Sequence, residues 1–186
     1  MFLCYLGLVV AVFPDVVFGG ASFIKRDILR YYYPVWHFAV QSMKQGVLPL
    51  WNPYNSYGTP FFANVQCCVL YPLSAILYLP DFLWAFNFYI LVHLTLAGFF
   101  TFLWMRDSGA STGACFLSGL VFMLSGYVMS GISLTISLCS LVYFPLVLLT
   151  LRRSFKRRSF VWKAFSGIVL TFQYLAGDPS VVFPPW

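Results

Sequence analysis

The segment RRSFKRRSFVWK, residues 152–163, carries six basic side chains and no acidic one, and long apolar segments lie on both sides of it. It holds more than half of the eleven Lys and Arg residues of the chain. Because basic residues concentrate in the cytoplasmic loops between membrane spans, we interpret this segment as such a loop. A solvated basic face or a nucleic-acid-binding patch is the alternative, but no soluble domain surrounds the segment, and we expect no nucleic-acid partner.

The composition of the chain predicts a multi-pass membrane protein. Hydrophobic residues make up 61% of the sequence, aromatic residues 21% and charged residues 9%, with a mean hydropathy of +0.83. Soluble domains contain about a quarter charged residues. The net charge of +6 lies largely in the basic segment, so it indicates orientation and contact with anionic membrane lipids.

Five apolar segments approach the roughly 20 residues that a membrane-spanning helix needs. We therefore predict an all-α, polytopic transmembrane bundle with about five spans, at residues 1–18, 84–105, 111–130, 134–151 and 161–177. A sixth apolar segment, residues 63–80, contains two prolines and several polar residues. If it crossed the membrane, every later helix would reverse and the basic segment would face outside. We therefore expect an interfacial or re-entrant helix there.

This orientation divides the chain into a large extracytoplasmic loop, residues 19–83, and a four-helix membrane region, residues 84–177. All five acidic residues are aspartates, and four of them then lie at the outer face: Asp15, Asp27, Asp81 and Asp178. The fifth, Asp107, lies on the cytoplasmic side, where we expect an ion pair with Arg106 or a solvated side chain.

Two features of the predicted spans concern packing. Small residues recur in the third span, among them Gly113, Gly119 and Gly126, and small residues let helix backbones approach closely. His93 lies within an apolar span, where we expect it to make a hydrogen bond between helices.

One carboxylate lies among three cations in the segment KRDILR, residues 25–30 of the loop. Lys25, Arg26 and Arg30 favour the ionised form of Asp27, which suits a general base or a ligand of a divalent cation. The same cations suit a lipid phosphate. A juxtamembrane ion pair without further function also explains the cluster.

The next part of the loop has the sequence features of a short amphipathic helix over residues 34–45. Pro34 suits the first turn of a helix, and Gly46 suits the residue after its end. His37, Gln41 and Lys44 then share one side, and we expect the helix to lie in the membrane interface. The side facing lipid or protein would carry Trp36, Phe38, Val40 and Met43.

The segment LPLWNPYNSYGTPF, residues 48–61, combines prolines and a glycine with aromatic side chains. This combination predicts a stiff loop without regular structure. Its aromatic faces, with asparagines nearby, suit a sugar, because rings stack on C–H faces and amides bond to hydroxyl groups. Aromatic anchoring in the membrane interface is the alternative.

Several segments resemble the N-terminal part of bacterial YfhO-type membrane proteins, which belong to the GT-C superfamily of multi-span glycosyltransferases. The similarity covers nearly all 186 residues and keeps the order of the elements. The segments are RDILRYYYP (26–34), QGVLPLWNPYNSYGTPFFANVQCCVLYP (45–72), NFYILVHLTLAGFFTFLWMRDSGAS (87–111), GLVFMLSGYVMS (119–130) and LAGDPS (175–180).

This resemblance implies one incomplete GT-C-like domain over residues 1–186, in the bacterial cell membrane. Its activity would be transfer of a sugar from a polyprenyl-phosphate carrier to an acceptor at the outer face. Asp27 occupies the place of the family's base or metal ligand, with Mg²⁺ or Mn²⁺ as the possible cation. Asp178, in a second outer-face motif, is the other candidate catalytic residue. The expected substrate-binding residues are Lys25, Arg26, Arg30, His37, Trp51, Asn52, Tyr54 and Tyr57.

The resemblance also implies that a longer polypeptide contains this chain, because family members have many more spans. The expected partners are membrane lipids, a polyprenyl-phosphate-linked sugar and the remainder of that polypeptide. Two alternatives stay open beside the enzyme. The chain could be a non-catalytic, transporter-like protein that binds the same lipid, or an inert fragment that only inserts into the membrane.

Overall fold

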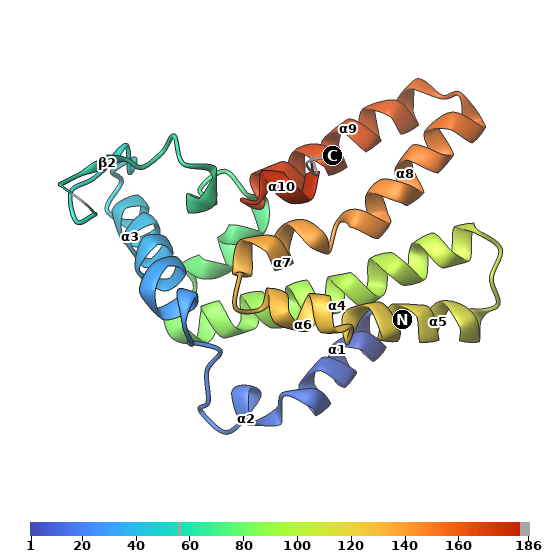
Figure 1. Cartoon of the computed structure of the whole chain (residues 1–186), viewed down its shortest axis with the longest axis horizontal. Helices are drawn as coiled ribbons and strands as arrows, with labels where there is room; N and C mark the ends of the chain where they lie inside the picture. Colours follow the sequence, from blue (N-terminus) through green and yellow to red (C-terminus); the bar gives the residue numbers. More distant parts are fainter. Residues whose placement is uncertain (56, 183–186) are drawn as a thin grey trace.

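The computed structural model describes residues 1–55 and 57–182, which form a mostly helical protein (Figure 1). The N-terminal part contains α1 (Phe2–Val12), α2 (Pro14–Val17), the π-helix η1 (Ile28–Tyr32), α3 (Tyr33–Lys44), β1 (Trp51–Asn52), β2 (Thr59–Pro60), and the 3₁₀ helices η2 (Val65–Cys67) and η3 (Pro72–Tyr78). The remainder contains α4 (Phe82–Asp107), α5 (Thr112–Met123), α6 (Gly126–Gly131), α7 (Thr135–Leu141), α8 (Phe144–Arg157), α9 (Phe160–Leu175) and α10 (Pro179–Val182).

Two helical segments are long and apolar enough to cross a membrane. They are α4, with 26 residues, and the nearly continuous α7–α8 segment Thr135–Arg157, with 23 residues. More than half of the most apolar stretch of each, 56% and 61%, is buried inside the molecule, as it also is in core helices of soluble proteins. Length and composition therefore establish two candidate spans.

The other three predicted spans are shorter than expected. α1 ends before Pro14, which begins α2, so residues 1–18 do not form one helix. The segment 111–130 is also interrupted, because the Ser125 hydroxyl accepts a hydrogen bond from the Val128 amide and caps a new helix. The predictions of one continuous helix in these two segments are wrong. α9 has 16 residues.

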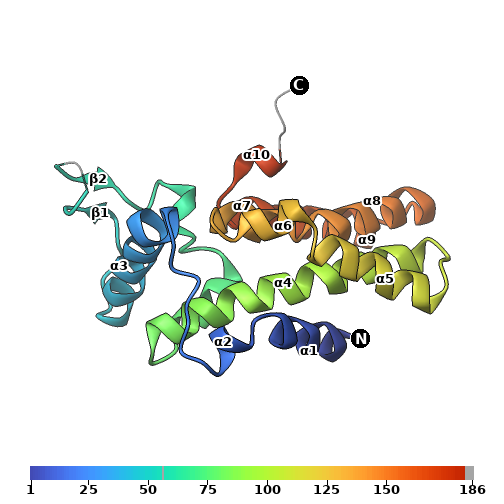
Figure 2. The same ribbon diagram turned by 60° about the horizontal axis from the view of Figure 1, so that its bottom comes forward.

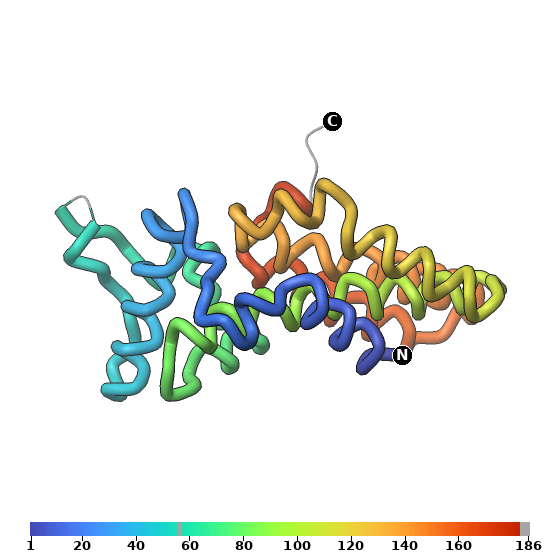
Figure 3. The backbone as a smooth tube through the Cα atoms, turned by 90° about the horizontal axis from the view of Figure 1, so that it is seen from below, coloured from blue at the N-terminus to red at the C-terminus, as the bar shows by residue number. Residues whose placement is uncertain are grey.

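α4 lies at the centre of the bundle, with α1, α5 and α8 packed along it (Figures 2 and 3). The closest approach is at Gly119 of α5, where an added Cβ would lie 2.5 Å from the Gly98 carbonyl oxygen and in contact with the Tyr5 hydroxyl. Tyr5 donates to the Phe116 carbonyl at 3.0 Å. Gly113 has open space around it, so the recurring small residues do not all serve packing.

The molecule has two distinct ends (Figure 1). The loop end is formed by residues 19–83, with α3 and the β1–β2 hairpin. The basic end is formed by the α4–α5 and α8–α9 turns. Residues 63–80 contain short 3₁₀ helices, of which η3 packs on α4, and no α-helix long enough to span a membrane. This agrees with the exclusion of this segment from the predicted spans.

The basic end differs from its prediction in two ways. α8 continues to Arg157, so much of the predicted loop is helical. Asp107 pairs with Arg153, at 2.7 Å from Oδ1 to Nε, and with Arg152 at 3.6 Å. The expected Arg106–Asp107 pair is therefore wrong, because the α8 helix brings two other arginines to the carboxylate.

Buried aromatic residues join the loop end to the bundle. Trp36 of α3 is 1% exposed, and its ring lies 5.6 Å from Phe86 and 5.4 Å from Tyr89 of α4, measured between centroids. The Trp36 indole N–H also donates to the Gln66 carbonyl at 2.9 Å. These contacts fix the orientation of α3.

A buried hydrogen-bond chain adds to this connection. His93 Nδ1 bonds to the Tyr89 carbonyl at 2.7 Å, so Nδ1 carries the proton and Nε2 accepts. Tyr71 donates its hydroxyl to Nε2 at 2.8 Å and bonds to the Tyr143 hydroxyl at 2.9 Å. The prediction that His93 links elements by hydrogen bonding is confirmed.

Candidate functional site

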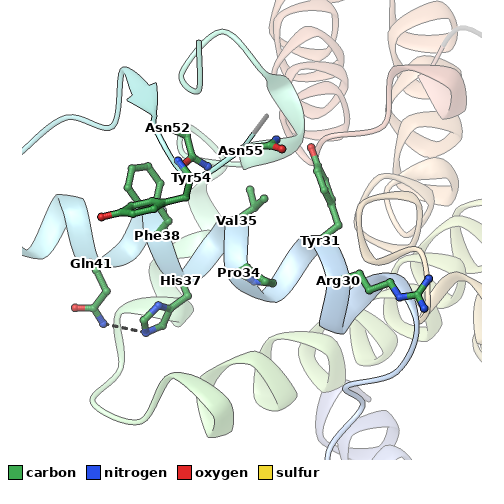
Figure 4. A pocket seen from close by; sticks show the side chains of 10 residues that line it. All are labelled: Arg30, Tyr31, Pro34, Val35, His37, Phe38, Gln41, Asn52, Tyr54 and Asn55. Carbon is green, nitrogen blue, oxygen red and sulfur yellow. Dashed lines mark hydrogen bonds between the residues drawn. The ribbon is translucent and has the colours of Figure 1, made fainter. Parts of the chain in front are cut away.

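A cavity of about 500 Å³ lies at the loop end, between η1, α3 and the hairpin (Figure 4). Its volume is within the roughly 300–1,000 Å³ of small-molecule sites. Figure 4 shows side chains of α3 on one side and of the hairpin on the other. The lining residues are Arg30, Tyr31, Pro34, Val35, His37, Phe38, Gln41, Asn52, Tyr54 and Asn55.

α3 forms one wall, and its predicted bounds are correct to within a residue at each end. The buried side of this helix packs on α4 through Trp36, and the His37 ring also reaches α4, where it lies 5.0 Å from the Phe82 ring between centroids. His37 is exposed and Gln41 is half-buried, and their side chains lie 3.4 Å apart at hydrogen-bonding distance. Their predicted common side is confirmed.

The hairpin forms the facing wall. Asn52 is 6% exposed, and its Oδ1 accepts the Tyr54 amide at 2.9 Å, which closes a tight turn. Tyr54 packs its ring edge-to-face on Phe38 at 5.9 Å. The prediction that this segment lacks regular structure is wrong, because two residues on each side form antiparallel pairs, Trp51↔Pro60 and Asn52↔Thr59.

The chemistry of this cavity suits binding of a polar, anionic ligand with hydroxyl groups. Arg30 offers the fixed hydrogen-bond donors that recognise phosphate, and Gln41 and Asn52 offer amide groups. Phe38 and Tyr54 add aromatic surface. No carboxylate is among the ten lining residues.

Asp27 lies three residues before Arg30 in the chain, is exposed, and is not among the residues that line the cavity. Among residues 1–55 and 57–182, no cation lies within ion-pair distance of its carboxylate. The alternative of a simple juxtamembrane ion pair is therefore not what the structure contains. Arg26 has a positive φ of 47°, and the π-helix η1 follows directly. Strained residues and π-turns cluster at functional sites.

Asp178 is held differently. One of its carboxylate oxygens accepts a hydrogen bond from the Ser137 hydroxyl, and the other accepts the Ser180 amide at 3.1 Å. The Asp178 amide donates to the Ser140 hydroxyl at 3.1 Å. These bonds fasten the start of α10 to α7, so the carboxylate has a positioning function here.

Asp27 and Asp178 nevertheless lie near the same buried side chain, Tyr32. Tyr32 is buried, and burial raises the pKa of its phenol to about 12, with the negative charges of Asp27 and Asp178 raising it further. Both carboxylates therefore lie within electrostatic reach of one side chain.

Four of the eight predicted binding residues are not among the residues that line this cavity. Lys25 lines a separate cavity together with Asp15. Trp51 stacks over Gly58, where an added Cβ would be 2.4 Å from the indole ring, and Tyr57 is fully exposed. Arg26 is likewise exposed and not among the lining residues.

The described residues do not form a preorganised metal centre. No group of three His, Cys, Asp or Glu side chains within residues 1–55 and 57–182 is arranged to hold an ion. Asp27 could supply one carboxylate, and Mg²⁺ often binds through one carboxylate together with substrate phosphates. We derive no step through a metal.

The prediction omitted Tyr31, Phe38 and Gln41 as cavity residues. A signal was present, because residues 31, 34, 35 and 38 follow the spacing of one helix face. Pro34 led to a predicted helix start at residue 34, so Tyr31 was not assigned to this helix face. The π-turn of η1 instead continues into α3.

No family model matches the chain, and neither a curated protein nor a solved structure is significantly similar to it. The resemblance to YfhO-type proteins therefore stays a prediction from the quoted segments.

Proposed function

We propose that this chain is a multi-span membrane protein whose loop end binds a polyprenyl-phosphate-linked sugar, as part of a GT-C-type glycosyltransferase. The observation that carries the proposal is the 500 Å³ cavity, which combines an arginine, amide groups and aromatic rings. Phosphate and a sugar ring require these three kinds of group together. The loop end faces outward in this proposal, and the basic end faces the bacterial cytoplasm.

Exposed apolar side chains support the membrane location. Val121 of α5 is 70% exposed, and Leu117 of the same helix is 59% exposed. On α9, Val161 is 71% exposed and Ile168 is 50% exposed. Soluble monomers rarely present such continuous apolar surface to water. Lipid chains would cover these two helices, and the two long helical segments would span the bilayer.

The cavity residues have distinct functions in carrier binding. Arg30 donates charge-assisted hydrogen bonds to the carrier phosphate. His37, which also lines the cavity, makes a further contact with the carrier. Tyr54 stacks on the C–H face of the sugar, and Asn52 and Gln41 bond to its hydroxyl groups. The buried contacts of α3 keep this arrangement rigid before the ligand arrives.

Asp27 acts as the general base in the transfer step. Its carboxylate takes the proton of the acceptor hydroxyl, whose oxygen attacks the anomeric carbon. The bond from this carbon to the carrier phosphate breaks, and the phosphate leaves with the electron pair. Arg30, which lines the cavity, stabilises the charge that develops on the phosphate. Asp178 holds α10 in place and does not react.

A second function is favoured by one observation. Because no carboxylate lines the cavity, the same site could bind the lipid carrier without catalysing transfer. The two functions differ only in whether Asp27 reaches the acceptor hydroxyl, so one set of variants separates them.

The experiment uses the whole chain, reconstituted in vesicles, with a radiolabelled polyprenyl-phosphate sugar. Asp27→Asn keeps the shape of the side chain and removes the base, so transfer should fall by about 10²–10⁴-fold while carrier binding persists. Arg30→Ala should weaken carrier binding about tenfold or more. The matched controls are Asp81→Asn, which retains a residue that can cap α4, and Lys44→Ala on the same face as His37.

Undiminished transfer by Asp27→Asn would contradict the catalytic assignment. Carrier binding without any transfer by the native chain would favour the second function. No binding by the native chain, with both controls inserted normally, would reject both.

A further inference from the structure

A second cavity, of about 370 Å³, lies at the loop end where α1 turns into α2. Its walls come from segments far apart in the chain: the α1–α2 bend, residues 21–25, and the α6–α7 turn at Met129, Ile132 and Ser133. Among the residues that the structure describes, none lines both this cavity and the 500 Å³ cavity. It is therefore a separate site.

This cavity is lined by opposite charges that do not neutralise each other. Asp15 and Lys25 both line it, yet they form no ion pair in the part of the chain that the structure describes. A simple anion would be repelled by Asp15, and a simple cation by Lys25. The ligand that matches both is a zwitterion, with its negative group beside Lys25 and its positive group beside Asp15.

An apolar cavity of about 180 Å³ adjoins the charged one. Val16 lines both cavities, and the apolar one continues between α1 and α4 along Leu6, Val10 and Leu91. Its polar side chain Asn87 is committed to the backbone, accepting the Phe23 amide at 3.2 Å and donating to the Ala21 carbonyl at 3.3 Å. The apolar cavity therefore suits a hydrocarbon chain.

We propose that the two adjoining cavities bind an aminophospholipid such as phosphatidylethanolamine. The phosphate lies beside Lys25, the ammonium group beside Asp15, and an acyl chain in the apolar cavity. Trp84, half-exposed at the opening of the apolar cavity, has the amphipathic ring that favours the headgroup level of a bilayer. This inference rests on the membrane location proposed above and is independent of sugar transfer.

The binding test uses the whole purified chain, stripped of lipid in detergent and titrated with phosphatidylethanolamine or with phosphatidylglycerol, which lacks the ammonium group. Retained lipid is counted by native mass spectrometry. We expect phosphatidylethanolamine to bind about tenfold more tightly than phosphatidylglycerol, because one charge-assisted hydrogen bond distinguishes them. Asp15→Asn should remove this preference, and Lys25→Gln should weaken binding of both lipids.

The charge reversal Asp15→Lys should change the preference of the chain from phosphatidylethanolamine to phosphatidylglycerol. This test measures a gain of binding to one lipid, which a misfolded variant would not show. Asp81→Asn and Lys44→Gln, at the same end of the molecule, should bind both lipids as the native chain does. Equal binding of both lipids by the native chain, or an unchanged preference in Asp15→Lys, would overturn the proposal. Flotation of the chain with vesicles measures the membrane location separately.

Discussion

The two ends of this molecule use their charges in opposite ways. At the basic end, Asp107 pairs with Arg153, which is 46 residues away in the sequence, and the Arg153 guanidinium also lies 4.7 Å from the Trp162 ring centroid. At the loop end, Asp27 lies beside Arg26 in the sequence and makes no ion pair within the described residues. Asp27 and Arg26, which are adjacent in the sequence, form no ion pair, whereas Asp107 and Arg153, which are far apart in the sequence, do.

This difference separates structural charges from charges that are available to a ligand. The ion pairs at the basic end connect the end of α4 to α8, which is a structural function. At the loop end, Arg30, Asp15 and Lys25 line cavities, and none of them forms an ion pair within the described residues. A ligand phosphate or hydroxyl can therefore use their full hydrogen-bonding capacity.

The largest effect concerns the membrane location of the two ends. In a cysteine-free background, a single cysteine at Asn55 should react with a membrane-impermeant thiol reagent in intact cells, and one at Ser159 should react only after the cells are opened. The reason is that the proposed orientation places the basic end in the cytoplasm, where basic residues between membrane spans concentrate. The reverse labelling pattern would mean that the basic end faces outside. Equal labelling of both cysteines would mean that the two ends do not lie on opposite sides of a membrane.

Gly119→Ala should strongly disturb the packing of the bundle between the two ends. The added methyl group would meet the Gly98 carbonyl oxygen at 2.5 Å, and a backbone atom cannot move aside as a flexible side chain can. We expect a destabilisation of about 3 kcal/mol, measured by thermal unfolding in detergent. Gly113→Ala is the matched control, since its new methyl group meets nothing within 4 Å. Equal stability of both variants would contradict the close packing of α4 and α5.

Tyr71→Phe should loosen the loop end from the bundle. It leaves the buried His93 Nε2 without its donor and the Tyr143 hydroxyl without its partner. We expect a loss of about 1–2 kcal/mol and faster proteolysis within residues 19–83. Tyr78→Phe is the control, because Tyr78 is 36% exposed. If both variants resist protease equally, the chain of hydroxyl groups does not hold the loop.

Asp107→Asn should have the smallest effect. Arg153 and Arg152 are 32% and 41% exposed, so solvent screens both pairs. We expect a loss of stability below about 1 kcal/mol. Lys156→Gln removes a charge at the same end outside these ion pairs and should be neutral within about 0.5 kcal/mol. A loss of several kcal/mol in Asp107→Asn would contradict the expectation that solvent screens these ion pairs.

Local sequence signals were sufficient for much of the fold. Pro34 and Gly46 delimit α3 because a proline has no amide to satisfy and a glycine accepts the positive φ of 75° after the helix. The prolines of residues 63–80 exclude a spanning helix there. The predicted count of five spans does not account for the positions of Asp27 and Asp178, because only two helical segments are long and apolar enough to cross a membrane.

The composition of the sites was decided by tertiary structure. Arg30 and Lys25 are five residues apart, yet the turn at Arg26 directs them to different cavities, each completed by segments from elsewhere in the chain. Asp178 is fastened by Ser137, which no local pattern connects to it. Sequence periodicity specifies which side of a helix is apolar, but packing between distant segments selects the neighbours of each polar side chain. The helices were therefore predictable from local rules, whereas the cavities exist only because the packed bundle brings their walls together.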